Sequence, residues 1–156
     1  MERTLVLLKP DAVERGLIGR ILTRFEEKGL KAIGLQLRRY PEETIREHYA
    51  VHRERPFYAD LVRYMTSGPV VALALEGKDA IEVTRGLMGD TNARKAKPGT
   101  IRGDLGMSFS NNLVHGSDSA ESAERELALF FPDANRICEW TPRLEEVVYN
   151  VEEELR

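Results

Sequence analysis

The segment NLVHGSDSAESAERE, residues 112–126, is the stretch around which the chain is organised. It places an imidazole, His115, at the end of a short apolar run and directly before a helix start. Asp118 is followed three residues later by Glu121, which resembles a capping box and predicts a helix N-terminus here. Helix N-termini favour anions such as phosphate, because their free N–H groups and dipole are positive. By itself the segment fits a catalytic histidine and a buried structural histidine equally well.

Length and composition place the chain among ordinary globular proteins. Its 156 residues suit a single domain, residues 1–156, with one hydrophobic core. Hydrophobic residues make up 42% and charged residues 31%, the balance of a soluble protein. The net charge of -3 argues against a nucleic-acid-binding protein with a broadly basic surface, although it leaves room for a local basic pocket.

Cysteine content and the N-terminal apolar run bear on cellular location. Cys138 is the only cysteine, which excludes an intrachain disulfide and a thiolate zinc site and fits a reducing compartment. The apolar run at residues 4–8 is too short for a signal-peptide core or a membrane span. We therefore expect a cytoplasmic protein without a membrane partner.

Hydrophobic periodicity predicts a strand, a helix and a second strand before residue 40. Residues 4–8 have no helical spacing, which predicts a buried strand that ends at Lys9. An apolar stripe over residues 17–25, closed by Gly29, indicates an amphipathic helix. Alternation over residues 32–37 predicts a second strand. The residues expected on its core face are Ile33, Leu35 and Leu37.

The rest of the chain predicts a helical hairpin, a strand, a helix and a long loop. Pro56 separates two short helical segments that precede a continuous apolar strand at residues 70–75. A further helix begins at Lys78 and stops at Gly89. Residues 90–111 lack periodicity, and loops of this length inside a compact domain are usually functional or mobile. This loop leads into the last strand, which opens the quoted segment.

The order of these elements predicts the fold class. Strand, helix, strand, strand, helix, strand indicates a ferredoxin-like α+β sandwich, in which helices cover a four-stranded antiparallel sheet. The helical hairpin is inserted before the third strand, and the long loop precedes the last one. A C-terminal helix is expected over residues 141–156 with Pro142 at its first position, packed on the domain or on a neighbouring subunit.

The common phosphate and metal signatures are absent from the sequence. There is no Gly-x-x-x-x-Gly-Lys-Ser/Thr loop, no Gly-x-Gly-x-x-Gly turn and no paired His or Cys spacing for zinc. Walker-type, protein-kinase-type and zinc-enzyme mechanisms are therefore disfavoured. Several elements still supply basic or hydroxyl-bearing residues, namely Lys9, Arg85, Thr91, Arg102, Asn112 and His115. Taken singly, these residues also fit surface ion pairs and turns.

Together the same residues would form a cationic pocket for a polyphosphate. Arginine forks suit phosphate oxygens, and a lysine acts on them as a point charge. A neutral imidazole in such a pocket can attack the terminal phosphorus and form a phosphohistidine. The surrounding cations would stabilise the charge on the transferring phosphoryl group.

Five ordered motifs carry a resemblance to a known family over nearly the whole chain. They are Lys-Pro-Asp at 9–11, His-Tyr at 48–49 with Arg-Pro-Phe at 55–57, Ser-Gly-Pro-Val-Val at 67–71, Pro-Gly-Thr-Ile-Arg-Gly-Asp at 98–104, and Asn-Leu-Val-His-Gly-Ser-Asp at 112–118. With these motifs the chain resembles the nucleoside diphosphate kinases. The last motif is highly specific in that family.

The resemblance implies an enzyme that transfers the terminal phosphoryl group of ATP to a nucleoside diphosphate by a ping-pong mechanism. In that mechanism His115 is the phosphorylated nucleophile, and Mg²⁺ arrives with the nucleotide phosphates rather than on protein ligands. Ser117 and Glu126 match the positions that orient the histidine. The residues implied to contact phosphates or sugar hydroxyls are Lys9, Tyr49, Arg85, Thr91, Arg102 and Asn112.

The resemblance also implies a wall for the nucleotide base. Phe57 and Leu61 match that wall, although their spacing equally suits core packing. Stacking without hydrogen bonds to base edges discriminates little between bases, so broad base specificity is expected. Phe109 stands where the family often has a smaller aliphatic residue, which suggests that the base lies between two aromatic rings.

The family further implies a homo-oligomer, and the long C-terminal segment favours a hexamer over the alternative tetramer. Two features depart from the family pattern. Ala93 replaces a common proline in a loop that packs between subunits, and residues 150–156 extend past the usual end. Two other classes stay open, a catalytically weak regulatory member of the fold and a nucleic-acid-binding protein that reuses it. The complete set of site residues weighs against the first and the acidic balance against the second.

Overall fold

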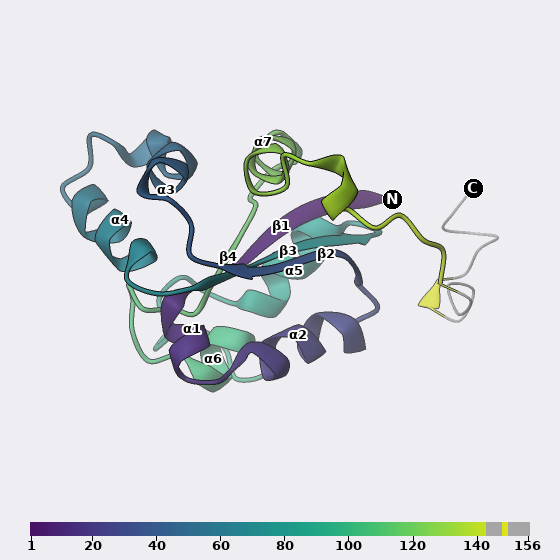
Figure 1. The fold of residues 1–156 in the computed structure, drawn as a ribbon. Coiled ribbons are helices and arrows are strands. Elements are labelled where there is room, and N and C mark those ends of the chain that lie inside the picture. The colour runs from purple at the N-terminus through teal and green to yellow at the C-terminus, as the bar shows by residue number, and fades with distance from the viewer. Residues whose placement is uncertain (143–147, 150–156) are drawn as a thin grey trace.

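A four-stranded antiparallel sheet forms the centre of the computed structural model, which describes residues 1–142 and 148–149 (Figure 1). The strand order is β2-β3-β1-β4, so β1 and β3 are central and both are almost wholly buried. The bounds are Glu2–Leu8 for β1, Lys31–Arg38 for β2, Val70–Gly77 for β3 and Val114–Gly116 for β4. This sheet confirms the predicted α+β fold class.

Helices cover both faces of the sheet, as Figure 1 shows. One face carries α1 (Pro10–Glu14), α2 (Ile18–Glu27), α5 (Ala80–Met88) and α6 (Ile101–Leu105). The other carries α3 (Glu42–His48), α4 (Tyr58–Thr66) and α7 (Ala120–Phe130). Short 3-10 helices occupy Ala50–His52 and Ala134–Arg136. The pair α3 and α4 is the predicted helical hairpin.

The core consists of two apolar layers, one on each face of the sheet, because successive side chains of the central strands point to opposite faces. Val6 and Leu8 of β1 pack with α2 and α5, whereas Leu5 and Leu7 pack against α4 and α7. Side chains of a strand point to opposite faces in turn, so a strand covered on both faces is apolar throughout. This explains the uninterrupted apolar run of β3.

Two short helices were not predicted. Helix α1 begins at Pro10, whose fixed φ and missing N–H suit the first helical position. Helix α6 lies inside the long loop, and Thr100 caps it by accepting a hydrogen bond from Gly103 N at 3.0 Å. Both helices have five residues, too few to show a hydrophobic period.

The prediction that Leu35 and Leu37 face the core is wrong. Both are 58% exposed, whereas Ile33 is buried. The register of β2 against β3 shifts between Ala32 and Gly34, so a bulge inserts one residue at this point. A shift of one residue exchanges the two faces of a strand, and it turns both leucines away from the face that buries Ile33.

The quoted segment and the chain end differ from the expectation in smaller ways. Ser119, not Asp118, is the N-cap of α7, because its Oγ accepts a hydrogen bond from Ser122 N at 3.1 Å.

Residues after α7 return to β2, where Cys138 N donates to Ile33 O at 2.6 Å. The predicted C-terminal helix at 141–156 falls mostly outside the described residues. Among the described helices, none has the length and apolar character to cross a membrane.

Candidate functional site

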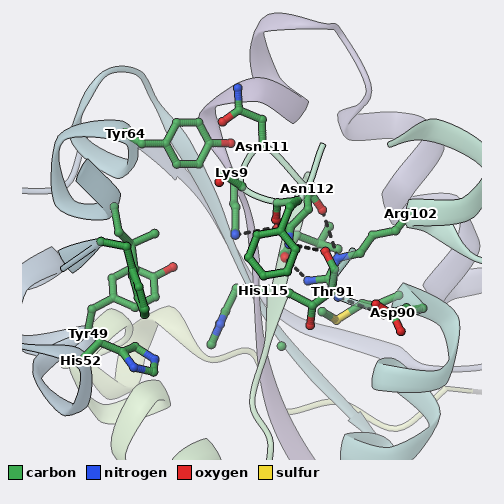
Figure 2. Close-up of a pocket in the computed structure, with 18 of the residues that line it drawn as sticks. Lys9, Tyr49, His52, Tyr64, Asp90, Thr91, Arg102, Asn111, Asn112 and His115 are labelled. Carbon is green, nitrogen blue, oxygen red and sulfur yellow. Dashed lines mark hydrogen bonds between the residues drawn. The ribbon is translucent and has the colours of Figure 1, made fainter. Parts of the chain in front are cut away.

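A pocket of about 890 Å³ opens beside β4, between the helical hairpin and the long loop (Figure 2). Tyr49 and His52 lie on one side of it, and Thr91 and Arg102 lie on the opposite side. The volume lies in the range of small-molecule sites, about 300–1,000 Å³. Ten residues predicted for the site or its base-binding wall line the pocket together: Lys9, Tyr49, Phe57, Leu61, Arg85, Thr91, Arg102, Phe109, Asn112 and His115.

His115 lies in the middle of β4, where it pairs with Leu7 of the central strand β1. Its Nε2 lies 3.2 Å from Oε2 and 3.3 Å from Oε1 of Glu126 on α7. Ser117 Oγ donates to the same Glu126 Oε2 at 2.6 Å and accepts from Leu5 N at 3.3 Å. An Nε2–H that donates to the buried carboxylate leaves the imidazole lone pair on Nδ1. This arrangement fixes the orientation of the imidazole ring.

Lys9 supplies a buried cation at the end of β1. Its Nζ donates to Asn112 Oδ1 at 2.7 Å. Burial lowers the pKa of Lys9 to about 8, and the nearby Arg102 charge adds to this effect. An anion in the pocket would favour the protonated amine, so the site is prepared for negative charge.

Arg102 and Asn112 have a structural role that sequence reasoning missed. The Arg102 guanidinium donates to three carbonyl oxygens, those of Asn112 at 3.1 Å, Gly89 at 2.9 Å and Val114 at 2.7 Å. Burial lowers the pKa of Arg102 to about 10, and the Arg85 charge contributes. Asn112 Nδ2 donates to the carbonyl oxygens of Thr91 at 2.9 Å and Phe109 at 3.1 Å. The two side chains thus tie both ends of the long loop to β4.

The outer pocket is aromatic. Phe57 is 50% exposed and Phe109 is 59% exposed, and both line the pocket with Leu61. Tyr49 is buried, and its burial raises the pKa of its phenol, so it is a neutral donor. Exposed aromatic rings at the mouth of a pocket are available for stacking on a planar ligand.

Three residues near the site had no assigned role from sequence. The buried His48 ring lies edge-on to the His115 ring, with centroids 4.6 Å apart. The Asp11 carboxylate accepts hydrogen bonds from Leu113 N at 3.2 Å and from Tyr64 Oη. The Lys-Pro-Asp motif was a signal for Asp11, whereas nothing local to Tyr64 distinguishes it from a core tyrosine.

Carboxylates also line the pocket or lie next to it. Among the described residues, one group of potential metal ligands stands out, because His48, His115 and Glu126 each place a ligand atom within 4.8 Å of the others. Two imidazoles do not suit Mg²⁺, which prefers oxygen ligands and phosphates. Asp60, Asp90 and Asp118 line the pocket apart from this group.

Comparison with known proteins gives consistent matches over nearly the whole chain. Residues 2–136 match the family model described as nucleoside diphosphate kinase. A nucleoside diphosphate kinase of Synechococcus elongatus is 49% identical over 149 residues, covering 96% of this chain and 99% of that protein. One from Archaeoglobus fulgidus is 52% identical, covering 96% and 98%. The solved structure of a halophilic nucleoside diphosphate kinase from Halobacterium salinarum in complex with CDP is 51% identical, with a TM-score of 0.92, and the match covers 95% of this chain and 98% of that one.

Proposed function

The chain belongs to the nucleoside diphosphate kinase family, and we propose on that premise that His115 carries the phosphoryl group between the two nucleotides. The enzyme transfers the terminal phosphoryl group of a nucleoside triphosphate to a nucleoside diphosphate. The observation that carries the proposal is the Ser117–Glu126–His115 arrangement against the wall of a cationic pocket. A family relative bound to CDP supports nucleoside phosphates as ligands of this pocket.

The first half-reaction forms one bond and breaks one. The His115 lone pair attacks the terminal phosphorus of ATP, and the bond from that phosphorus to the bridging oxygen breaks. The electron pair leaves with ADP. In the second half-reaction a phosphate oxygen of the acceptor diphosphate attacks the same phosphorus, and the imidazole recovers its lone pair. The Glu126 carboxylate stabilises the positive imidazole ring in between.

The cations of the pocket act on the phosphates. Lys9, Arg85 and Arg102 line the wall near His115, and they stabilise the charge that spreads over the transferring oxygens. The hydroxyls of Tyr49 and Thr91 supply neutral donors for phosphate or sugar oxygens. Fixed donors of this kind need no reorganisation during the reaction.

A divalent cation fits this site through its substrate. The inner wall is cationic, and Asp60, Asp90 and Asp118 are the carboxylates that line the pocket. We propose that Mg²⁺ enters on the nucleotide phosphates, where it would neutralise charge on the leaving diphosphate. The residues that receive the complex are Lys9, Arg85, Thr91 and Arg102.

Labelling with γ-labelled ATP and Mg²⁺ tests the nucleophile. We expect an acid-labile, base-stable phosphate on the wild-type chain and none on a His115→Ala variant. A His52→Ala variant, which removes another imidazole that lines the pocket, controls for adventitious labelling and should retain the phosphate. Absence of label from the wild type, or full label on His115→Ala, would exclude the mechanism.

The two exposed rings support a base clamp. Phe57 and Phe109 both line the outer pocket, where each can stack on one face of a base. Stacking contributes about 1–3 kcal/mol per base and depends weakly on base identity. Phe109→Ala should therefore weaken the binding of ADP, GDP and CDP alike, measured by calorimetry. Unchanged affinity for every base would eliminate the second ring from the clamp.

The assembly is proposed to be a homo-oligomer, a hexamer or alternatively a tetramer. Leu35 and Leu37 are large, exposed apolar residues on β2, an edge strand of the sheet. An open apolar edge is a liability unless another chain covers it. We further propose that residues 1–156 form one domain, and the single cysteine supports a cytoplasmic location.

A further inference from the structure

Leu113 has an unusual backbone conformation immediately before the nucleophile strand. Its φ is +71°, and among the described residues only Asp79 and Leu113 have a positive φ without being glycine. The side chain is fully buried in the core, so a change of its backbone angles would disturb the packing around it. A Cβ disfavours the left-handed region, and such residues persist only where their surroundings hold them.

The Lys-Pro-Asp segment holds both polar groups of Leu113. The N–H of Leu113 donates to Asp11 Oδ2 at 3.2 Å, and its carbonyl oxygen accepts from Lys9 N at 2.8 Å. The other oxygen of Asp11 accepts from Tyr64 Oη on α4. One carboxylate therefore joins α1, the helical hairpin and the turn before β4.

We propose that Asp11 is a positioning residue, whose carboxylate holds Leu113 in the left-handed conformation and thereby places Asn112 and His115. The proposal rests on the role of His115 as the phosphoryl acceptor. Asp11 does not line the pocket, so it contacts neither the nucleotide nor the reacting atoms. It acts on the rate through the geometry of Leu113.

The shortness of β4 explains why such a restraint is needed. Only three residue pairs join β4 to β1, and His115 is the middle residue of the strand. Leu113 lies between Asn112, which bonds Lys9 Nζ, and the strand itself. Rotation of Leu113 towards an ordinary φ would turn the chain on both sides, which would separate the histidine from the cationic wall.

The test compares Asp11→Asn in three backgrounds, wild type, Leu113→Ala and Leu113→Gly. Alanine and glycine remove nearly the same side chain, but only glycine adopts a positive φ without strain. The readout is the single-turnover rate of phosphohistidine formation from γ-labelled ATP, with the KM for ATP measured alongside. Melting temperatures establish that each variant is folded.

We expect Asp11→Asn to lower the phosphorylation rate about tenfold or more in the wild-type and Leu113→Ala backgrounds, with KM within about twofold, because small misplacements of a nucleophile have large effects on rate. In Leu113→Gly the same substitution should lower the rate less than about threefold, because the turn then needs no restraint. Tyr64→Phe, which removes one partner of the carboxylate, should give an intermediate loss. Glu14→Gln, an exposed carboxylate on the same helix, is the control and should match wild type.

Two outcomes separate this proposal from the proposed mechanism. If the wild type forms no phosphohistidine, the mechanism fails. If the wild type is labelled and Asp11→Asn reacts at the wild-type rate, only the positioning role fails. Equal losses in the Leu113→Ala and Leu113→Gly backgrounds would also overturn it, because Asp11 would then act through general stability.

Discussion

Lys9 lies in an environment far from that of a solvated lysine. Its amine is buried, and burial lowers its pKa from 10.5 to about 8. The folded protein therefore disfavours the charged amine in the absence of an anion. A bound polyphosphate reverses this preference, because an opposite charge favours the protonated form.

Nucleotide affinity should decline as the pH rises above about 8, the pKa of Lys9. Calorimetric titration with ADP at pH 7 and pH 9.5 measures the decline. A Lys9→Met variant should bind weakly at both values with a smaller pH dependence. Equal wild-type affinity at the two pH values would contradict this role.

The effect of Lys9 on stability has the opposite sign. Between pH 8 and 10.5 the unfolded chain binds more protons at Lys9 than the folded chain does. The contribution of Lys9 to the free energy of unfolding therefore rises with pH in this range.

Glu126 is the second residue whose chemistry is open to a direct test. Glu126→Gln keeps the size of the side chain but removes the charge that faces His115 Nε2 and Ser117 Oγ. We expect kcat to fall on the order of tenfold or more, with little change in KM, because the orienting and stabilising charge is lost. Glu124→Gln, an exposed change on the same helix, provides the matched control for steady-state kinetics. A wild-type kcat for Glu126→Gln would show that the carboxylate is dispensable.

At the scale of elements, α7 links the stability of the fold to the site. The helix begins at the Ser119 cap and carries Glu126 to the back of His115. Its Phe130, one turn further along the same face, packs into the core. The helix thus anchors the orienting carboxylate at a fixed depth below β4.

Removal of the α7 cap should destabilise the protein. Ser119→Ala leaves the Ser122 N–H without its capping oxygen, which typically costs about 1 kcal/mol. Urea denaturation measures this as a lower midpoint with an unchanged slope. Glu124→Ala in the middle of the same helix should change stability by less than about 0.5 kcal/mol. A cap variant as stable as this control would show that water satisfies the helix end equally well.

At the scale of the whole molecule, the edge strand β2 divides into two parts. Its first part is covered by the chain itself, since Cys138 N and Trp140 Nε1 donate to the carbonyl oxygens of Ile33 and Ala32 at 2.6 and 3.3 Å. Its second part presents Leu35 and Leu37. The bulge between these parts therefore leaves an exposed apolar surface on β2.

Charged substitutions on this surface should disrupt the proposed homo-oligomer. A Leu35→Glu, Leu37→Glu double variant should sediment as a smaller species than wild type in analytical ultracentrifugation, because burying charges without partners is unfavourable. The exposed, uncharged Val51 on the helical hairpin offers a control, Val51→Glu, that should leave the sedimentation unchanged. An assembled double variant would place the interface elsewhere.

The fold and most of the site follow from local patterns in the sequence. Apolar runs and periods identify β1, α2, β3 and α5, because burial of one or both faces imposes a characteristic spacing. The motif around His115 predicts a nucleophile through its resemblance to the family, and the cations assigned to the site lie in one pocket. These properties depend on residue type and on neighbours within a few positions.

Other properties came only from tertiary structure. The bulge in β2 depends on its pairing with β3, and it reverses the faces of Leu35 and Leu37 without any change in the alternating pattern. The three carbonyl partners of Arg102, and the bonds from Asp11 to Leu113 and Tyr64, join residues distant in the chain. Local spacing identifies which side chains can do chemistry, whereas strand register and long-range hydrogen bonds decide which of them meet and in what orientation.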